Sequence, residues 1–327
     1  MAGPGAEAVA GAMADVIANS QQIELDAGGY RFHALSAEPV VADQSDGTPP
    51  LMLCLHGFPD CPATFVEQMR GFTAAGFRVV APYQRGYHPD TLSEENRYQT
   101  IELAQDALNL IDALGYERAV IFGHDWGASI ASGAAMLAPE KVTALITAAV
   151  PYGGKLGELL LIDADQQRRS WYMFFFQTAL AEMAVAHDNM AFIRRLWQDW
   201  SPGWKFPESQ LQLTLDTLAQ PGVLNAALCY YRCALDPDYQ HNDVAALQGR
   251  VGEELSTPTL HLHGGIDGCI GIRATENMAN HFSGPFELEL MPHAGHFLHQ
   301  EDSPFVNARV LEFLDRHAGR STSVPGT

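Results

Sequence analysis

Short apolar runs alternate with amphipathic stretches from about residue 50 onward, and no other feature of the sequence restricts the fold as strongly. The run LMLCLHG (51–57) is apolar throughout, which is typical of a strand buried on both faces. The stretch TIELAQDALNLIDALG (100–115) repeats leucine and isoleucine at helical spacing. Strands are therefore predicted at 51–57, 77–82, 119–125, 142–150, 257–267 and 286–292, and helices at 62–75, 100–115, 126–137, 272–282 and 303–318. This alternation predicts an α/β fold with a mostly parallel, doubly wound sheet.

The alternation stops after Pro151 and resumes near residue 257. Residues 152–240 contain no buried-strand run but many aromatic residues, as in WYMFFFQ and RRLWQDWSPGW, and they are interpreted as several helices. We therefore expect a core domain formed by residues 1–151 and 241–327. A helical cap domain formed by residues 152–240 is expected to interrupt it.

The charge balance limits the partners of the chain. It has 327 residues, with 19 Lys and Arg against 39 Asp and Glu and a formal net charge of -20. Nucleic acids and anionic membranes require a basic surface, which such a protein lacks. No apolar run approaches the roughly 18 residues of a membrane span, and the N-terminus lacks the basic start of a signal peptide. The sequence therefore predicts a cytoplasmic protein that binds neither nucleic acid nor a membrane.

Asp125 stands at the centre of GHDWGA, whose small residues have the spacing of a nucleophile elbow, a strand-to-helix turn usually written G-x-S-x-G. Gly123 and Gly127 suit such a turn because side chains there would crowd the crossing of strand and helix. Asp267 and His296 each follow a later predicted strand, and the carboxyl ends of parallel strands meet at one edge of a sheet. The chain order of nucleophile, acid and histidine is that of α/β-hydrolases.

A carboxylate in place of the usual serine indicates a particular chemistry. Serine that attacks a saturated carbon would leave an ether, which a histidine-activated water cannot cleave. Aspartate that attacks a saturated carbon leaves an ester, which water can open at the carbonyl of the aspartate itself. An elbow carrying Asp125 therefore favours the opening of C–O or C–halogen bonds at saturated carbon over ester hydrolysis.

The motifs HGFPD and GHDWGA, with the downstream Asp and His, resemble the epoxide hydrolases of the α/β-hydrolase superfamily over roughly residues 20–318. Haloalkane dehalogenases are the nearest relatives of that group. The resemblance implies the α/β-hydrolase fold with an inserted helical cap (lid) and two cap tyrosines that hold the epoxide oxygen. YMFFFQ places Tyr172 five residues before Gln177, and CYYRC places Tyr231 before an arginine. After Gln177 the sequence TALAEMAV departs from the Pro-Gly continuation of the family, which leaves the cap shape and substrate range open.

The resemblance implies a hydrolase that acts on the ether bond of an epoxide and forms a vicinal diol without a cofactor or metal. Asp125 would attack the ring carbon as the nucleophile, while Tyr172 and Tyr231 hydrogen-bond and protonate the ring oxygen. His296, oriented by Asp267, would then act as the general base for the water that hydrolyses the ester. A small apolar epoxide and water are the expected partners. The oligomeric state cannot be read from the sequence, so a homodimer stays open.

Two further roles are expected around this Asp-His-Asp triad. The backbone N–H groups of Phe58 and Trp126 are expected to form the oxyanion hole. The side chains of Phe58, Trp126 and Trp171 are expected to bind the substrate.

Each of these roles has a competing interpretation. Asp125 could be a helix N-cap in an inactive protein, since aspartate commonly caps helices. Asp163 is an alternative acid, although it lies inside the predicted cap. Tyr230 competes with Tyr231, because aromatic residues in a cap more often pack than react.

The histidines around His296 and the cysteines are the residues that could suggest a metal site. His293 and His299 flank His296, but Pro292 and Gly295 argue against a helix that presents all three together. The chain has five cysteines, an odd number in a chain too large to need a disulfide framework. Those in the predicted helix of LCYYRC stand four apart and are interpreted as small core residues. No metal site is therefore expected.

Two other functions are compatible with this fold, a haloalkane dehalogenase and a non-catalytic binding protein. A haloalkane dehalogenase would use the Asp125 nucleophile and hold the departing halide with the Trp126 indole. Those enzymes usually place a second polar donor after HG, where this chain has Phe58. A non-catalytic binding protein with this fold would typically lack the nucleophile or the histidine, and here both are present.

Overall fold

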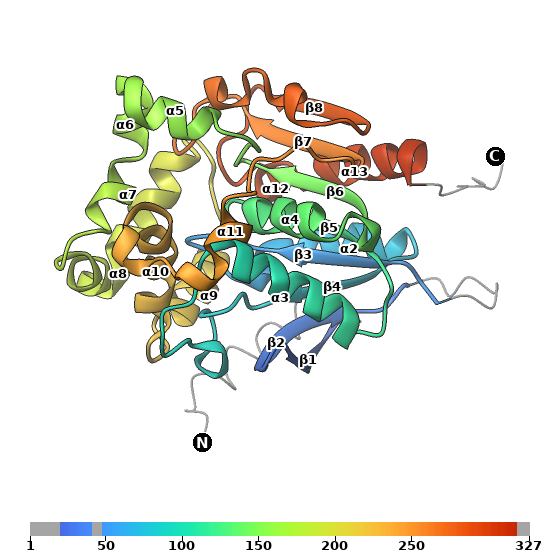
Figure 1. The fold of residues 1–327 in the computed structure, drawn as a ribbon, viewed down its shortest axis with the longest axis horizontal. Coiled ribbons are helices and arrows are strands. Elements are labelled where there is room, and N and C mark those ends of the chain that lie inside the picture. The colour runs from blue at the N-terminus through green and yellow to red at the C-terminus, as the bar shows by residue number, and fades with distance from the viewer. Residues whose placement is uncertain (1–19, 41–47, 319–327) are drawn as a thin grey trace.

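The computed structural model describes residues 20–40 and 48–318 of the chain (Figure 1). The N-terminal segment 1–19, on which the expectation about a signal peptide rests, lies outside these residues. Within the described part of the chain, no helix combines the length and the apolar character that crossing a membrane would require.

A single sheet of eight strands forms the centre of the molecule, in the order β1-β2-β4-β3-β5-β6-β7-β8. Strands β3 to β8 run parallel, whereas β1 and β2 are antiparallel to their neighbours. The strands are β1 (Ser20–Ala27), β2 (Tyr30–Ala37), β3 (Leu51–Leu55), β4 (Arg78–Pro82), β5 (Ala119–His124), β6 (Val142–Ala148), β7 (Thr259–Gly264) and β8 (Phe286–Met291). Every predicted strand is present, and the expected mostly parallel sheet is confirmed.

The hairpin of β1 and β2 is not indicated by the buried-strand pattern. β1 alternates exposed and partly buried residues instead of forming an apolar run. Gly28 and Gly29 form its turn with φ values of 57° and 87°, in the left-handed region that glycine adopts without strain. This pair of glycines is the sequence signal that could have located the hairpin.

Helices cover both faces of the sheet (Figure 1). On one face α3 and α4 pack against each other, and on the other face α2 packs against α13. These core helices are α2 (Val66–Ala74), α3 (Thr100–Ala113), α4 (Trp126–Leu137), α12 (Leu298–Glu301) and α13 (Ser303–His317), with the short 3-10 helices η1 (Pro62–Phe65), η2 (Pro89–Thr91) and η3 (Pro139–Lys141). The predicted helix at 272–282 is wrong. The structure has two 3-10 helices there, η6 (Ile272–Thr275) and η7 (Met278–His281), because Asn277 adopts a left-handed φ of 61° between them.

A run of helices lies between β6 and β7 in the chain and beyond one end of the sheet in space (Figure 1). We call α5 to α10 the inserted helices. They are α5 (Lys155–Ile162), α6 (Ala164–Arg169), α7 (Trp171–Phe175), α8 (Ala181–Trp200), α9 (Glu208–Leu218) and α10 (Val223–Leu235), and η4 (Pro237–Tyr239), η5 (Asn242–Val244) and α11 (Ala245–Gln248) lead back to β7. Helix α8 is interrupted at residues 188–190, which have positive φ values. The division into a core and a cap domain at residues 152 and 240 stays a prediction.

Candidate active site

The turn between β5 and α4 presents Asp125 at the carboxyl end of the sheet. Asp125 has φ 54° and ψ -119°, a strained conformation for a residue with a side chain. A Cβ on Gly123 would lie 2.1 Å from the carbonyl oxygen of Gly127, and a Cβ on Gly127 would lie 1.9 Å from that of Leu55. Only glycine therefore fits at either position. The Asp125 side chain makes no capping hydrogen bond to α4, which argues against the N-cap interpretation.

Asp125, His296 and Asp267 form a line of interacting side chains. Asp267 Oδ2 lies 2.9 Å from His296 Nδ1, and His296 Nε2 lies 3.5 Å from Asp125 Oδ2. The other oxygen of Asp125 accepts a hydrogen bond from the backbone N–H of Phe58 at 2.8 Å. All three side chains are buried, and Asp125 is only 4% exposed. The structure thus brings together the three residues that the chain order predicted.

The charges of the two carboxylates control the imidazole between them. Burial lowers the pKa of His296, but Asp267 and Asp125 together outweigh it and raise that pKa to about 10. Burial raises the pKa of Asp267, and the adjacent His296 outweighs it, so the net shift is downward. The imidazole therefore carries a proton at neutral pH. When one of the carboxylates loses its charge, the pKa of the imidazole falls, so the ring can release its proton and become available as a base.

The inserted helices hold the loops that carry the acid and the histidine. The carbonyl oxygen of Trp200, at the end of α8, accepts hydrogen bonds from the N–H of Gly268 at 2.9 Å and from the N–H of His296 at 3.0 Å. The chain passes so close that a Cβ on Gly268 would lie 2.0 Å from the carbonyl oxygen of Asp199. One backbone carbonyl thereby connects both loops of the His–Asp pair. Its role leaves no signal in the sequence, because any residue type can supply a carbonyl.

Two buried tyrosines of the inserted helices lie near Asp125. Tyr172 in α7 and Tyr231 in α10 are 0% and 1% exposed, and their ring centroids are 5.5 Å apart. The ring of Tyr231 packs edge-on against Phe58 at 5.4 Å and against Trp126 at 5.1 Å. Burial raises the pKa of both phenols well above 10, and the negative charge of Asp125 raises it further. Both hydroxyls therefore keep their protons at neutral pH.

The structure separates Tyr231 from its neighbour. The hydroxyl of Tyr230 donates to the backbone carbonyl of Arg85 at 2.6 Å, and its ring stacks on Tyr98. Tyr230 therefore serves the packing of α10 against the core. The hydroxyl of Tyr231 donates to no acceptor among the described residues, and its hydrogen-bonding interaction is with the side chain of Trp126. It is the member of the pair that is free to meet a ligand.

Trp171 does not join this group. Its side chain is 45% exposed, and its ring packs on Phe175 and Phe192 rather than on the triad. The expectation that Trp171 binds the substrate is therefore not supported by its position. The reason is helical geometry: the next residue, Tyr172, points in a different direction from the same short helix and is completely buried.

The alternative acid and the flanking histidines have other partners. Asp163 caps α6 by accepting hydrogen bonds from two backbone N–H groups and pairs with Arg273. His293 is exposed, whereas His299 is buried with its Nε2 2.6 Å from Thr64 Oγ1. All five cysteines are buried and none forms a disulfide, including Cys229 and Cys233 on α10.

Three groups of side chains within the described residues have an arrangement that could hold a metal ion, since each offers ligand atoms within 4.8 Å of one another. They are His33, His88 and Asp90; Asp60, His124 and His299; and Asp267, Cys269 and His296. The first lies at the surface, and the last two are buried. The third contains two of the predicted catalytic residues, so a metal there would compete with the hydrogen bond between Asp267 and His296.

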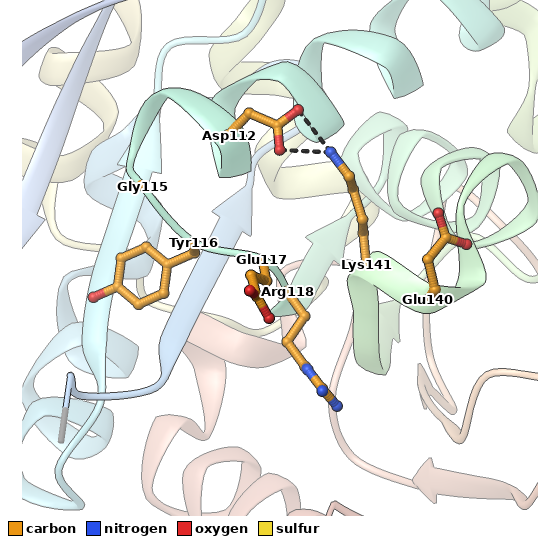
Figure 2. Close-up of a pocket in the computed structure, with 7 residues that line it drawn as sticks. All are labelled: Asp112, Gly115, Tyr116, Glu117, Arg118, Glu140 and Lys141. Carbon is orange, nitrogen blue, oxygen red and sulfur yellow. Dashed lines mark hydrogen bonds and ion pairs between the residues drawn. The ribbon is translucent and has the colours of Figure 1, made fainter.

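A surface pocket of about 480 Å³ lies away from the triad (Figure 2). Figure 2 shows its lining residues, Asp112, Gly115, Tyr116, Glu117, Arg118, Glu140 and Lys141, with the ion pair between Lys141 and Asp112. These residues precede β5 and β6, whereas Asp125 follows β5. Ligands of parallel sheets bind outside the carboxyl ends of the strands, so this pocket is not the candidate active site.

Comparisons with known proteins agree with this geometry. The profile of the alpha/beta hydrolase fold matches residues 50–303. Epoxide hydrolase 3 of Mus musculus is 31% identical over 297 residues, which cover 88% of this chain and 74% of that protein. Epoxide hydrolase 1 of Caenorhabditis elegans is 29% identical over 270 residues, or 82% of this chain and 65% of that protein.

Solved structures show the same relationship. The crystal structure of an epoxide hydrolase from Bacillus megaterium, complexed with its product, a naphthyloxy-propane-1,2-diol, aligns with a TM-score of 0.74 and 26% identity. The alignment covers 90% of this chain and 100% of that one. The family profile and these relatives show that the chain belongs to the α/β-hydrolase family and, within it, to the epoxide hydrolases.

Proposed function

We propose that this protein hydrolyses a small apolar epoxide to a vicinal diol through an ester formed on Asp125. The observation that carries the proposal is the position of the Asp125 carboxylate, 3.5 Å from His296 Nε2, together with two buried tyrosines whose charge environment includes Asp125. The Tyr231 ring packs on Trp126 and Phe58, which adjoin Asp125. A ring-opening reaction needs a nucleophile on one side of the breaking bond and a proton donor on the other. The named epoxide hydrolases among its relatives support the same substrate class.

In the first half-reaction, an Asp125 oxygen forms a bond to a ring carbon and the C–O bond of the epoxide breaks. Tyr231 or Tyr172 gives its proton to the departing oxygen, which becomes the first hydroxyl of the diol. Formation of the ester removes the negative charge of Asp125. Because that charge helps to raise the pKa of His296, the imidazole then gives up its proton, which restores the tyrosine.

In the second half-reaction, neutral His296 activates a water that attacks the ester carbonyl of Asp125. The ester bond breaks between the carbonyl carbon and the alcohol oxygen, the second proton of the water passes to this oxygen, and the diol leaves. His296 takes the proton released by the water and is again an imidazolium between two carboxylates. Asp267 keeps the imidazole oriented through the 2.9 Å contact to Nδ1.

The backbone N–H of Phe58 is placed to serve the second half-reaction. It already donates to Asp125 Oδ1 at 2.8 Å, and this oxygen becomes the oxyanion when water attacks the ester. One such donor contributes about 3 kcal/mol to the transition state in measured oxyanion holes. The N–H of Trp126 is proposed as the second donor.

The nucleophile and the two tyrosines of the site are buried. Asp125 is 4% exposed, and the two tyrosines above it are 0% and 1% exposed. Burial of this kind excludes bulk water around a bound epoxide and strengthens the electrostatic interactions of the charged groups. The surrounding rings of Phe58, Phe176 and Trp126 favour an apolar substituent on the epoxide.

The deciding experiment traps the ester. His296→Gln protein is mixed with a panel of aryl and alkyl epoxides and short haloalkanes, and the intact mass is measured. The variant should alkylate and stall, and the gain in mass identifies the substrate. His293→Gln, an exposed histidine three residues away, is the matched control and should turn over without accumulating adduct. Adducts from haloalkanes only, with halide release, would assign a dehalogenase instead.

A single turnover of the wild type in heavy-oxygen water tests the route of the water. Hydrolysis of an ester on Asp125 places the label in that carboxylate. Label found only in the diol would contradict the ester.

A further inference from the structure

Cys269 occupies a junction that the proposed reaction does not use. Its Sγ lies 3.2 Å from the hydroxyl oxygen of Tyr172. Its backbone N–H donates to Asp267 Oδ1 at 2.7 Å, and its carbonyl accepts from the side-chain amide of Gln166 at 2.9 Å. One residue thus contacts the acid of the triad, a tyrosine of α7 and helix α6. Cys269 is 0% exposed, and burial raises the pKa of its thiol well above 9, so it is neutral at physiological pH.

The contact makes the two tyrosines unequal. Tyr172 and Tyr231 belong to the same buried cluster and both lie near Asp125. The O–H of Tyr172 has the thiol sulfur as an acceptor, whereas the O–H of Tyr231 has no acceptor among the described residues and interacts only with the donor side chain of Trp126. A buried hydroxyl without an acceptor gains the full energy of a new hydrogen bond when a substrate oxygen arrives, whereas a hydroxyl that already has one gains only the difference.

The thiol determines how much free energy Tyr172 gains when the epoxide oxygen replaces the sulfur as its hydrogen-bond acceptor. A tyrosine O–H is the stronger donor of the pair, and a cysteine sulfur is a weak acceptor. Tyr172 therefore exchanges sulfur for an epoxide oxygen at little cost. An alcohol oxygen in the same position would be a stronger acceptor and would hold the phenol more firmly.

We propose that Cys269 is a positioning residue that holds the Tyr172 hydroxyl through a weak, exchangeable hydrogen bond until the epoxide oxygen replaces the sulfur. This inference rests on the proposed function, because it concerns a donor to the epoxide oxygen. It assigns Tyr231 as the dominant donor and Tyr172 as the second. The Cys269 side chain acts only through Tyr172, and its backbone contact to Asp267 is kept when the side chain is changed. Substitution should therefore affect ring opening and leave ester hydrolysis unchanged.

The test compares both half-reactions in Cys269→Ser protein. Alkylation is measured in the His296→Gln background as the rate at which intact protein gains the mass of a styrene oxide-type aryl epoxide. Ester hydrolysis is measured in the His296-containing protein after a single turnover. We expect alkylation to be about five-fold slower than in the parent, because the serine oxygen accepts a stronger hydrogen bond from the Tyr172 hydroxyl than sulfur does. The rate of ester hydrolysis should not change. In the Tyr172→Phe background, Cys269→Ser should leave alkylation unchanged.

Two controls separate this role from a structural one. Cys233→Ser alters an equally buried thiol of α10, which bonds to the carbonyl of Asn96 and not to a tyrosine, and should leave both rates unchanged. Cys269→Ala removes the acceptor, so the Tyr172 hydroxyl is no longer held, and alkylation should slow only in protein that keeps this hydroxyl. This variant provides a second test if Cys269→Ser does not fold. Thermal unfolding checks the folding of each variant.

Three results would overturn the inference. They are equal slowing by Cys269→Ser with and without the Tyr172 hydroxyl, slowing of hydrolysis instead of alkylation, and a folded Cys269→Ala variant that alkylates as fast as the parent. If the parent itself forms no adduct with any epoxide, the proposed function fails rather than the role of Cys269.

Discussion

The two sides of the site differ in how their polar atoms are held. On the core side, Asp125, Asp267 and His296 interact with one another, and backbone N–H groups also donate to the two carboxylates. On the helix side, aromatic neighbours pack tightly around the rings of Tyr172 and Tyr231. The Tyr172 hydroxyl has only the weakly accepting sulfur of Cys269 as a partner, and the Tyr231 hydroxyl has no acceptor among the described residues. The core side is thus an electrostatic arrangement completed before substrate arrives. The helix side keeps its donors available for the substrate.

The difference follows from the tasks that we propose for the two sides. A charged group that must remain buried needs permanent partners, because an unpaired buried charge is costly. A neutral phenol tolerates burial without a strong partner and yields its hydrogen bond to a developing alkoxide. Changes on the core side should therefore abolish the reaction, whereas changes on the helix side should slow only ring opening.

The largest effect is expected for Asp125→Asn. An amide cannot form the ester, so the rate of diol formation should fall by about 10⁴ or more, as for other residues that act as a unit in covalent catalysis. The measurement is kcat/KM with the epoxide identified by the mass experiment. Asp163→Asn, which changes a helix cap away from the triad, is the control and should retain activity. Activity of Asp125→Asn within ten-fold of the wild type would falsify the nucleophile assignment.

An intermediate effect is expected on the helix side. Tyr231→Phe should slow alkylation by roughly 10²-fold and Tyr172→Phe by about ten-fold, because general-acid assistance contributes in this range and the hydroxyl of Tyr231 is the one without an acceptor among the described residues. Rates are measured by single-turnover mass spectrometry. Tyr230→Phe removes the hydrogen bond to Arg85 and should affect stability more than alkylation. A larger loss at Tyr172 than at Tyr231 would reverse the proposed ranking.

The smallest effect concerns pH and stability on the core side. His296 has a pKa of about 10 in the folded protein, above the value of 6.5 expected without these neighbours. Its charged form therefore stabilises the fold fully below pH 6.5, and this contribution is lost as the pH rises through 10. The free energy of unfolding should fall from pH 7 to 10 in the wild type and fall less in His296→Gln, as measured by urea unfolding.

Asp125→Asn should move the His296 titration to lower pH, since one of the two carboxylates is gone. Identical pH profiles of the wild type and His296→Gln would refute this account of the triad charges.

Local patterns in the sequence determined much of the core side. The periodicity of apolar residues predicted the parallel strands, and in such a sheet residues after successive strands meet at one edge whatever the loops between them. The glycines around Asp125 identified the elbow, because their absence of side chains is a steric requirement of the turn itself. The order of Asp125, Asp267 and His296 along the chain then indicated which groups would meet.

Only the tertiary structure decided the helix side and the contacts between the two sides. Whether Tyr230 or Tyr231 lies near Asp125 depends on the rotation of α10 against the core, and the exposure of Trp171 depends on how α7 lies on its neighbours. The contact of Cys269 with Tyr172 joins residues 97 positions apart, and the carbonyl of Trp200 binds two loops without any side-chain signature. Such contacts arise from the packing of whole elements, and a linear pattern cannot encode the angle at which one helix meets another.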